Sequence, residues 1–263
     1  MIVHAFFCRR FLSLGLLVLC YPLAAVEPIG YEVIATYPHD ADAWTQGLYY
    51  EGGKLFESTG LRGESTLRQV DLQTGTVLKK LALEDAYFGE GATLFRGQLY
   101  QLTWQAGKGF IYDPDGFEKT GEFEYTGEGW GLTHDETHLI LSDGTATIRF
   151  LDPETFEVTR QIKVTLQSRP VRHLNELEYV DGFIYANVWY QNVIVKIDPA
   201  TGAIVGLLNL ADLWPDRPTE EGAVLNGIAY DPEQHVFLVT GKLWSKLFAI
   251  RLTENGGEVL TSD

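Results

Sequence analysis

Short runs rich in β-branched and aromatic residues fill most of the chain after residue 30, and clusters of Gly, Asp, Asn and Pro separate them. Long apolar runs at helical spacing are scarce in this part of the chain. Runs of this length and composition, bounded by turn-forming residues, are typical of strands. The pattern therefore predicts an all-β protein.

Five segments repeat the same order of elements. They begin at Gly47 (GLYYEGGKLF), Gly91 (GATLFRGQLY), Gly131 (GLTHDETHLI), Glu176 (ELEYVDGFIY) and Gly227 (GIAYDPEQHVF), with separations of 44, 40, 45 and 51 residues. Each segment has an apolar strand, a tight turn and a second strand, then a third strand that generally ends near an Asp and a fourth after another turn. Four strands per unit of this length predict a five-bladed β-propeller with four antiparallel strands per blade.

A solenoid is the structural alternative, but its units are usually shorter or helical. The strand-like sequence YEVIATY, residues 31–37, precedes the first repeat. An unclosed propeller would leave two strand edges exposed. We therefore expect this strand to pair into the last blade and close the ring.

The register of the repeats predicts which side chains meet at one end of the central channel. The residues directly before the five repeats are Gln46, Glu90, Trp130, Asn175 and Asn226. The second strands end at Gly60, Trp104, Gly144, Trp189 and Gly241, and Lys242 follows the last of these. Residues that only maintained a symmetric fold would tend to repeat, whereas these differ from blade to blade. The register therefore predicts one asymmetric pocket containing a carboxylate, amides, indoles and an ammonium group.

Two Gly-Glu-Gly sequences look alike but fall at different positions of the repeat. Glu90, in YFGEGATL, occupies the ring position. In GEGWGL the ring position is held by Trp130, and Glu128 lies two residues earlier, in line with Phe88. The glycines around Glu90 permit close approach of a ligand or of backbone. Tyr87, Phe88 and Trp130 are candidates to desolvate its carboxylate, which would raise its pKa as an acid/base near neutral pH requires.

Each of these residues also has an ordinary structural interpretation. Glu90 alone fits a loop carboxylate equally well, Lys242 fits a solvated turn lysine, and a single tryptophan is more often a core residue. His134 and His138 have the spacing of a zinc-binding helix, but the repeat places them on either side of a β-turn, so we expect no metal site there. The Asp residues of DLQTG, DPETF and DPATG recur in successive repeats and are predicted turn formers.

The N-terminal residues predict export. Arg9 and Arg10 precede the apolar run FLSLGLLVLC, and small residues follow up to about Ala25, so residues 1–25 are expected to form a cleaved signal peptide. Residues 26–263 are then expected to form a single propeller domain in the periplasm or in the medium. Both cysteines, Cys8 and Cys20, lie in the removed segment, so no disulfide is expected. The remaining chain has 18 basic and 36 acidic residues, which disfavours binding to nucleic acid or to an anionic membrane.

Eight short sequences, in order, resemble the glutamine cyclotransferases of the plant and bacterial type. They are YPHDADAWTQGL, LFESTGLRGESTLRQVDLQTG, YFGEGATL, LYQLTW, YTGEGWGLT, LNELEYVDGFIYANVW, LNGIAYD and FLVTGKLWSKLF. The resemblance extends from about Tyr37 to Ile250, nearly the whole chain after the predicted signal peptide. That family is a five-bladed propeller, in agreement with the repeat count.

The resemblance implies cyclisation of an N-terminal glutaminyl residue of a peptide or protein to pyroglutamyl, with release of ammonia. Glu90 of the YFGEG motif would be the general acid/base, and Lys242 is best placed by charge to stabilise the oxyanion. Substrate-binding residues would surround them: Trp104, Trp130 and Trp189 as aromatic walls, and Gln46 and Asn175 as hydrogen-bonding amides. Trp44, in WTQG, stands where phenylalanine is expected and is a candidate to alter the preference for the second residue of the substrate.

The animal enzymes of this activity belong to a different, zinc-dependent class, so neither a catalytic metal nor another cofactor is expected here. We expect a monomer with peptide substrates as its partners. Two other classes stay open at this point. A metal-dependent propeller lactonase uses Glu, Asn and Asp around a central cation, and Glu90, Asn175 and Asn226 resemble part of such a set. A propeller that only binds partners is the third possibility.

Overall fold

The computed structural model describes residues 26–253, and within them every regular element is a strand. The predicted all-β class is confirmed. The predicted signal peptide, residues 1–25, lies outside the described residues.

The first three repeats each form a separate sheet of four antiparallel strands. The first sheet contains β2 (Thr45–Glu51), β3 (Lys54–Thr59), β4 (Thr66–Val70) and β5 (Val77–Ala82). The second contains β6 (Gly89–Phe95), β7 (Gln98–Thr103), β8 (Lys108–Tyr112) and β9 (Lys119–Glu124). The third contains β10 (Leu132–His134), β11 (Leu139–Ser142), β12 (Thr147–Leu151) and β13 (Val158–Lys163). A small hairpin follows, made of β14 (Thr165–Leu166) and β15 (Arg169–Pro170).

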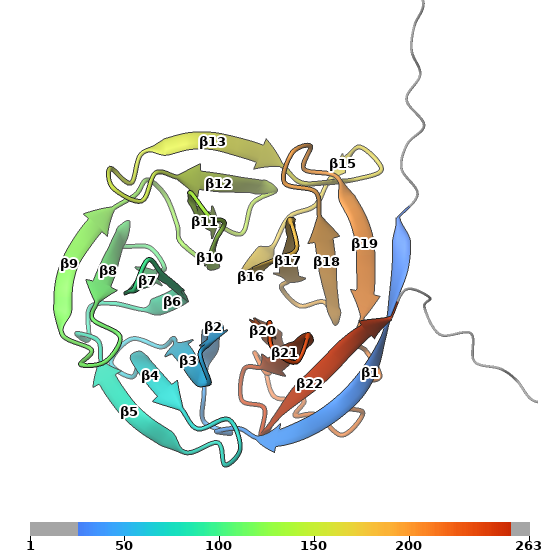
Figure 1. The fold of residues 1–263 in the computed structure, drawn as a ribbon, viewed down its shortest axis with the longest axis horizontal. Helices are drawn as coiled ribbons and strands as arrows, with labels where there is room; N and C mark the ends of the chain where they lie inside the picture. Colours follow the sequence, from blue (N-terminus) through green and yellow to red (C-terminus); the bar gives the residue numbers. More distant parts are fainter. Residues whose placement is uncertain (1–25, 254–263) are drawn as a thin grey trace, which may run out of the picture.

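The last two repeats share one sheet of eight strands. The fourth repeat supplies β16 (Leu174–Val180), β17 (Phe183–Val188), β18 (Val193–Ile197) and β19 (Ile204–Asn209). The fifth supplies β20 (Leu225–Asp231), β21 (Val236–Gly241) and β22 (Lys246–Thr253), and β1 (Glu27–Pro38) is the fourth strand beside them. Figure 1 shows the five groups arranged around a central axis, with β2, β6, β10, β16 and β20 innermost.

The N-terminal strand β1 joins the two ends of the ring. It pairs antiparallel with β22 over Gly30–Thr253 to Pro38–Lys246, as expected for residues 31–37. Its first residues also pair parallel with β19, where Glu27 is opposite Gly206. This second pairing was not predicted. It joins the fourth and fifth groups into one sheet of eight strands.

Five apolar clusters form the core, and each lies between two neighbouring groups of strands. The cluster that includes Leu48, Leu55 and Leu238 joins the first repeat to the fifth. Burial of these side chains is the main favourable contribution to folding. Because each face of the inner strands is covered by a neighbour, the ring has apolar contacts all the way round.

The turns at the periphery use the predicted aspartates. The Asp71 carboxylate accepts hydrogen bonds from the backbone N and Oγ1 of Thr74, both at 2.8 Å. Asp152 accepts from the backbone N–H groups of Glu154 and Thr155, and Asp198 from that of Ala200. These bonds replace the ladder partners that the backbone loses at a turn, so the recurring Asp residues are turn formers.

A buried ion network fastens the ring closure to the first sheet. Glu57 of β3 is 1% exposed, and its Oε1 accepts a hydrogen bond from Thr45 Oγ1 at 2.7 Å and lies 3.0 Å from His39 Nε2. Its Oε2 is 3.2 Å from Arg68 Nε. Burial alone would raise the pKa of Glu57, but the His39 and Arg68 charges lower it to about 2. The other His39 ring nitrogen, Nδ1, is 2.6 Å from the Trp244 carbonyl, next to β22.

Candidate active site

A cavity of about 210 Å³ lies at one end of the inner strands. It is lined by Trp44, Gln46, Phe88, Glu90, Trp104, Trp130, Asn175, Trp189 and Lys242. Eight residues predicted from the repeat register or the family resemblance therefore line one cavity, although they are spread over almost 200 positions of the chain. Phe88 is the ninth. Asn226, the fifth residue of the predicted ring, does not line it.

The repeat explains how residues so far apart come together. Gln46, Glu90 and Asn175 lie at the beginnings of the innermost strands β2, β6 and β16. The indole residues Trp104 and Trp189 directly follow the second strands β7 and β17. An inner strand begins where its antiparallel neighbour ends, so these residues share one end of the ring. Lys242, directly after β21, reaches the same place from the fifth repeat.

At the position directly after each ring residue, the inner strands approach one another too closely for most side chains. A Cβ atom built on Gly91 would collide with the Leu132 backbone nitrogen, and one on Gly131 with the Asn175 carbonyl oxygen. The fourth repeat has Glu176 at this position instead of glycine. Its carboxylate oxygens accept hydrogen bonds from the backbone N–H groups of Leu48 (3.2 Å) and Ile228 (2.8 Å). Glu176 therefore ties three inner strands together beside the cavity.

Glu90 is the only carboxylate that lines this cavity, and it is 4% exposed. Gln46 Nε2 donates a hydrogen bond to Glu90 Oε1 at 3.1 Å, and Ser58 Oγ donates to the Glu90 backbone carbonyl. Burial raises the pKa of Glu90 well above its ordinary value. The nearby Lys242 charge opposes this shift and the Glu128 charge adds to it. One hydrogen bond from a neutral amide leaves the carboxylate able to take up a proton at mild pH.

Lys242 is the cation of the cavity, and it too is 4% exposed. Its Nζ lies 5.5 Å from the centre of the Trp44 ring, within the range of a cation–π contact. Burial lowers the pKa of Lys242 to about 8, although the Glu90 charge acts in the opposite direction. The site therefore holds an acid and a base whose pKa values are both shifted toward neutrality by the same apolar walls.

Aromatic rings form those walls in two edge-to-face pairs. The Trp130 and Trp189 ring centres are 5.4 Å apart at 90°, and those of Phe88 and Trp104 are 5.6 Å apart at 63°. Tyr87, the other aromatic residue beside Glu90, turns away and packs on Phe110. Of the two rings that precede Glu90, only Phe88 therefore shields it. The apolar lining excludes water and strengthens electrostatic interactions within the cavity.

Buried amides connect the remaining polar atoms. Asn226, which does not line the cavity, donates from Nδ2 to the Thr45 carbonyl at 2.9 Å and to Gln46 Oε1 at 3.4 Å. Asn226, Gln46 and Glu90 thus form a short hydrogen-bonded chain. Asn175 is 3% exposed, and its Oδ1 has no hydrogen-bond partner among the described residues. A buried acceptor without a partner is a suitable contact for a donor on a bound ligand.

Two residues support the cavity without lining it. The register predicts Asn226 as part of the pocket, but the residue instead donates a hydrogen bond to Gln46. Glu128 had no predicted site role, and its Oε2 accepts hydrogen bonds from Trp104 Nε1 and Trp130 Nε1. Its place in the repeat gave no indication of these contacts.

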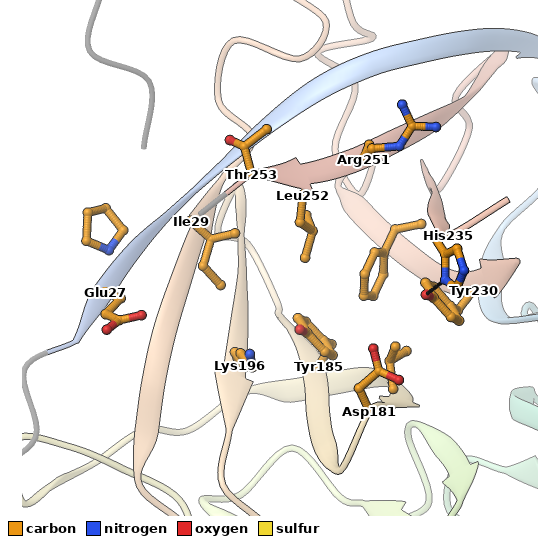
Figure 2. A pocket seen from close by; sticks show the side chains of 13 residues that line it. Glu27, Ile29, Asp181, Tyr185, Lys196, Tyr230, His235, Arg251, Leu252 and Thr253 are labelled. Atoms are coloured by element: carbon orange, nitrogen blue, oxygen red, sulfur yellow. Dashed lines mark hydrogen bonds between the residues drawn. The ribbon is translucent and has the colours of Figure 1, made fainter. Parts of the chain in front are cut away.

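Figure 2 shows a larger cleft, of about 790 Å³, between β1 and β22 on one side and β17 and β18 on the other. Tyr185, Lys196, Tyr230, His235 and Arg251 are among its lining residues. The Tyr230 hydroxyl bonds to His235 Nδ1 at 3.1 Å. None of the predicted site residues lies here. The smaller cavity is the candidate active site, because it joins buried ionisable groups of both signs to an apolar wall.

Two further observations concern metal and membrane. Within residues 26–253, no three His, Cys, Asp or Glu side chains are grouped to hold a metal ion. His134 and His138 flank the β10–β11 turn, as predicted, where Nε2 of His134 meets the Tyr49 hydroxyl and Nδ1 of His138 lies beside Asp135. The described part of the chain also contains no helix that could cross a membrane.

The chain belongs to the glutamine cyclotransferase family, whose sequence model matches residues 16–252. It is 44% identical over 228 residues to the glutaminyl-peptide cyclotransferase of Arabidopsis thaliana, an alignment that covers 85% of this chain and 71% of the plant protein. Its structure is similar to the crystal structure of Myxococcus xanthus glutaminyl cyclase, with a TM-score of 0.82 and 38% identity over 87% of this chain and 98% of the bacterial one. The family resemblance inferred from the eight sequence motifs is thereby confirmed.

Proposed function

We propose that this chain is a glutaminyl-peptide cyclotransferase, which converts N-terminal glutaminyl residues of peptides or proteins to pyroglutamyl residues and releases ammonia. The observation that carries the proposal is the pair of buried groups, Glu90 and Lys242, inside an aromatic cavity of about 210 Å³. That volume suits one glutaminyl residue. Membership of the family and 44% identity to a plant glutaminyl-peptide cyclotransferase support the same activity.

The reaction is an intramolecular acyl transfer. The α-amine nitrogen attacks the γ-carboxamide carbon of the same residue, so one C–N bond forms and the carbonyl becomes a tetrahedral oxyanion. The original C–N bond then breaks, and the nitrogen leaves as ammonia. One proton moves from the attacking nitrogen to the leaving nitrogen, and no oxidant or co-substrate is consumed. The protein has to fold the side chain into a reactive conformation, move that proton and stabilise the oxyanion.

Glu90 is assigned the proton transfer. Its ionised carboxylate accepts the proton from the α-amine, and the neutral acid delivers it to the departing nitrogen. A raised pKa suits both steps, because the ionised and the neutral form are then close in free energy. The single hydrogen bond from Gln46 fixes one carboxylate oxygen and leaves the other for the substrate.

The other cavity residues are assigned to binding. The Lys242 ammonium stabilises the oxyanion, as a buried charge does more effectively than one in water. Trp44, Trp104, Trp130 and Trp189 enclose the methylene groups of the substrate and exclude water that would compete with the amine. The unpartnered Asn175 Oδ1 accepts a hydrogen bond from the substrate amide or amine, and Gln46 contributes a second polar contact.

The finer architecture and the cellular setting are part of the proposal. We assign the five groups of strands as the blades of a five-bladed β-propeller, with β1 as the outer strand of the last blade. The apolar clusters between all five pairs of neighbours support this assignment. Residues 26–263 are taken as one metal-independent catalytic domain that acts as a monomer. Residues 1–25 are taken as a signal peptide that directs export to the periplasm or the medium.

Mass spectrometry of a Gln-initiated dipeptide tests the activity. Incubation with the protein should produce a species lighter by about 17 Da, the mass of the ammonia lost on cyclisation. The matched control is the same dipeptide with an acetylated α-amine, which cannot attack and should stay unchanged. Turnover should persist in excess chelator, because no step uses a metal. Chelator-sensitive hydrolysis of a lactone would instead indicate the lactonase class, and turnover of neither substrate would indicate a binding protein.

A further inference from the structure

We propose that Glu128 is a positioning residue of the candidate active site, which fixes two tryptophan walls of the cavity and also acts electrostatically on Glu90. The proposal rests on the cyclotransferase function proposed above. Glu128 does not line the cavity, but its carboxylate is hydrogen-bonded to two indoles that do.

The geometry at the Glu128 carboxylate carries the proposal. Its Oε2 accepts hydrogen bonds from the indole Nε1 of Trp104 and of Trp130, each at 2.9 Å. Its Oε1 accepts a third bond, from Gln105 Nε2, at 3.2 Å. Trp104 follows β7 in the second repeat, whereas Trp130 precedes β10 in the third. One carboxylate therefore joins wall residues from two neighbouring repeats.

These contacts favour an ionised carboxylate. An ionised carboxylate has acceptor sites only, so it matches three N–H donors, and hydrogen bonds to it are stronger than those between neutral groups. Burial would raise the pKa of Glu128, but the bonds from Trp130, Gln105 and Trp104 lower it below its ordinary value. Glu128 is thus ionised throughout the range in which the cavity groups titrate.

The main chain around Glu128 is itself held in place. The buried Arg149 of β12 donates from NH2 to the Glu128 carbonyl at 2.9 Å and from NH1 to the Thr126 carbonyl at 2.5 Å. The Gly129 N–H donates to the Trp104 carbonyl at 3.0 Å. These bonds are independent of the side chain, so removing the carboxylate should release the indoles without unfolding the loop.

Each indole held by Glu128 packs on a second ring of the cavity. Trp104 contacts Phe88, and Trp130 contacts Trp189, in both cases edge to face. Four of the five aromatic residues that line the cavity are therefore connected through one carboxylate. The fifth, Trp44, lies on the Lys242 side. Displacement of the two indoles would open the wall and admit water to Glu90.

The charge of Glu128 also acts on Glu90. It raises the pKa of Glu90, adding to the larger effect of burial and opposing the Lys242 ammonium. Lys242 and Glu128 are the charged groups that act on Glu90. Around Glu128, Arg149 is bound to its carbonyl, Asp143 is 3.5 Å from Arg149 NH2, and Arg62 lies 5.9 Å from the centre of the Trp104 ring. Removing the negative charge of Glu128 should therefore lower the pKa of Glu90.

Two variants separate the two effects. Glu128→Ala removes all three hydrogen bonds, so KM should rise and kcat/KM should fall by about 10-fold or more, the scale of losing bonds to a charged group. Its tryptophan emission should shift to longer wavelength and become more accessible to acrylamide. Glu128→Gln keeps one carbonyl acceptor for the indoles but removes the charge. It should retain more activity, and the acid limb of its kcat/KM profile, set by Glu90 in the free enzyme, should move to lower pH.

Glu136→Gln is the matched control, since it removes one exposed negative charge in the β10–β11 turn. It should leave emission, KM and pH profile unchanged. The proposal fails if Glu128→Ala has the same KM and tryptophan emission as the natural chain. It also fails if the acid limb of the kcat/KM profile lies at the same pH in Glu128→Gln and in Glu136→Gln. If circular dichroism shows that Glu128→Ala does not fold, the tryptophan emission and the pH profile of kcat/KM of Glu128→Gln test the proposal instead. If the natural chain cyclises nothing, the proposed function fails, whereas emission and quenching still test the indole contacts.

Discussion

Two buried glutamates, Glu90 and Glu57, show opposite uses of the same side chain. Both are almost completely buried, at 4% and 1% exposure. Glu57 lies between His39, Arg68 and Thr45, and these partners lower its pKa to about 2. Glu90 has one amide donor on its carboxylate and a more distant ammonium, so burial prevails and its pKa is raised. Burial alone therefore does not determine the protonation state; the number and charge of the partners do.

The largest expected effect is on turnover, and it belongs to Glu90. Glu90→Gln should lower kcat by about 10²–10⁴-fold, because the carboxamide cannot relay the proton. Thermal unfolding should change little, since the amide is nearly isosteric and does not need to be ionised. Steady-state release of ammonia from a Gln-initiated dipeptide measures the loss. Near-normal turnover in this variant would contradict the assignment of Glu90 as acid/base. Glu128→Gln is the comparison variant, and its loss of turnover should be smaller.

For Glu57 the expected effect is on stability and not on turnover. Glu57→Gln should lower the free energy of unfolding by about 3–5 kcal/mol, because it leaves the buried Arg68 and His39 charges without their partner. Turnover of the molecules that remain folded should be close to normal. Denaturant unfolding followed by circular dichroism measures the first quantity, and kcat per folded molecule measures the second. A variant as stable as the natural chain would show that the network contributes no stability.

Trp189→Ala sharpens the comparison by removing one aromatic wall of the cavity that holds Glu90. It should reduce kcat/KM by about 10-fold or more, because the ring encloses the substrate and keeps water from the carboxylate. Tyr190→Ala is the control, since that ring contacts Trp189 at a tilt of 44° but is 56% exposed and does not line the cavity. Equal specificity constants for Trp189→Ala and the natural chain would place Trp189 outside the substrate pocket.

The smallest effect is a difference in pH dependence. Lys242 has a pKa of about 8, so its positive charge is present below that pH and lost above it. The kcat of the natural chain should therefore fall as pH rises through about 8. Lys242→Gln should have a lower kcat without this alkaline limb. Glu57, whose pKa is lowered, instead contributes stability that is complete above its unfolded pKa and lost as pH falls toward about 2. Measuring kcat and the free energy of unfolding between about pH 2 and about pH 10 tests the roles of Lys242 and Glu57 respectively.

The repeat register accounts for how much of the molecule could be predicted from sequence. It predicted the all-β class. It also predicted that Gln46, Glu90, Trp130 and Asn175 lie at one end of the inner strands, because equivalent positions of a repeat meet around an axis. Only the family resemblance could add Trp44, which lies before the register position. Phe88 was predicted only as one of three aromatic candidates to shield Glu90, because sequence alone does not show which of two adjacent rings turns inward.

The rest depended on contacts between residues that no repeat relates. The second pairing of β1, with β19, follows from the length of that strand beyond YEVIATY and not from its hydrophobic pattern. The ion network of His39, Glu57 and Arg68 joins the loop after β1 to two neighbouring strands of the first sheet. The bonds of Glu128 run to side chains that only the folded loops bring within reach. Such contacts are set by tertiary packing, which local sequence does not encode.

The pairing of β1 with β22 constrains the order in which the molecule can fold. Each hairpin within a repeat can form as soon as its own residues are available, because its ends are close in sequence. Closure between the first and last strands must wait for the whole chain and bears the largest loop entropy. Until that step, the outer edges of β19 and β22 lack their partner strand and can pair with another molecule. The final strand thus sets the interval during which a newly made chain is open to misassembly.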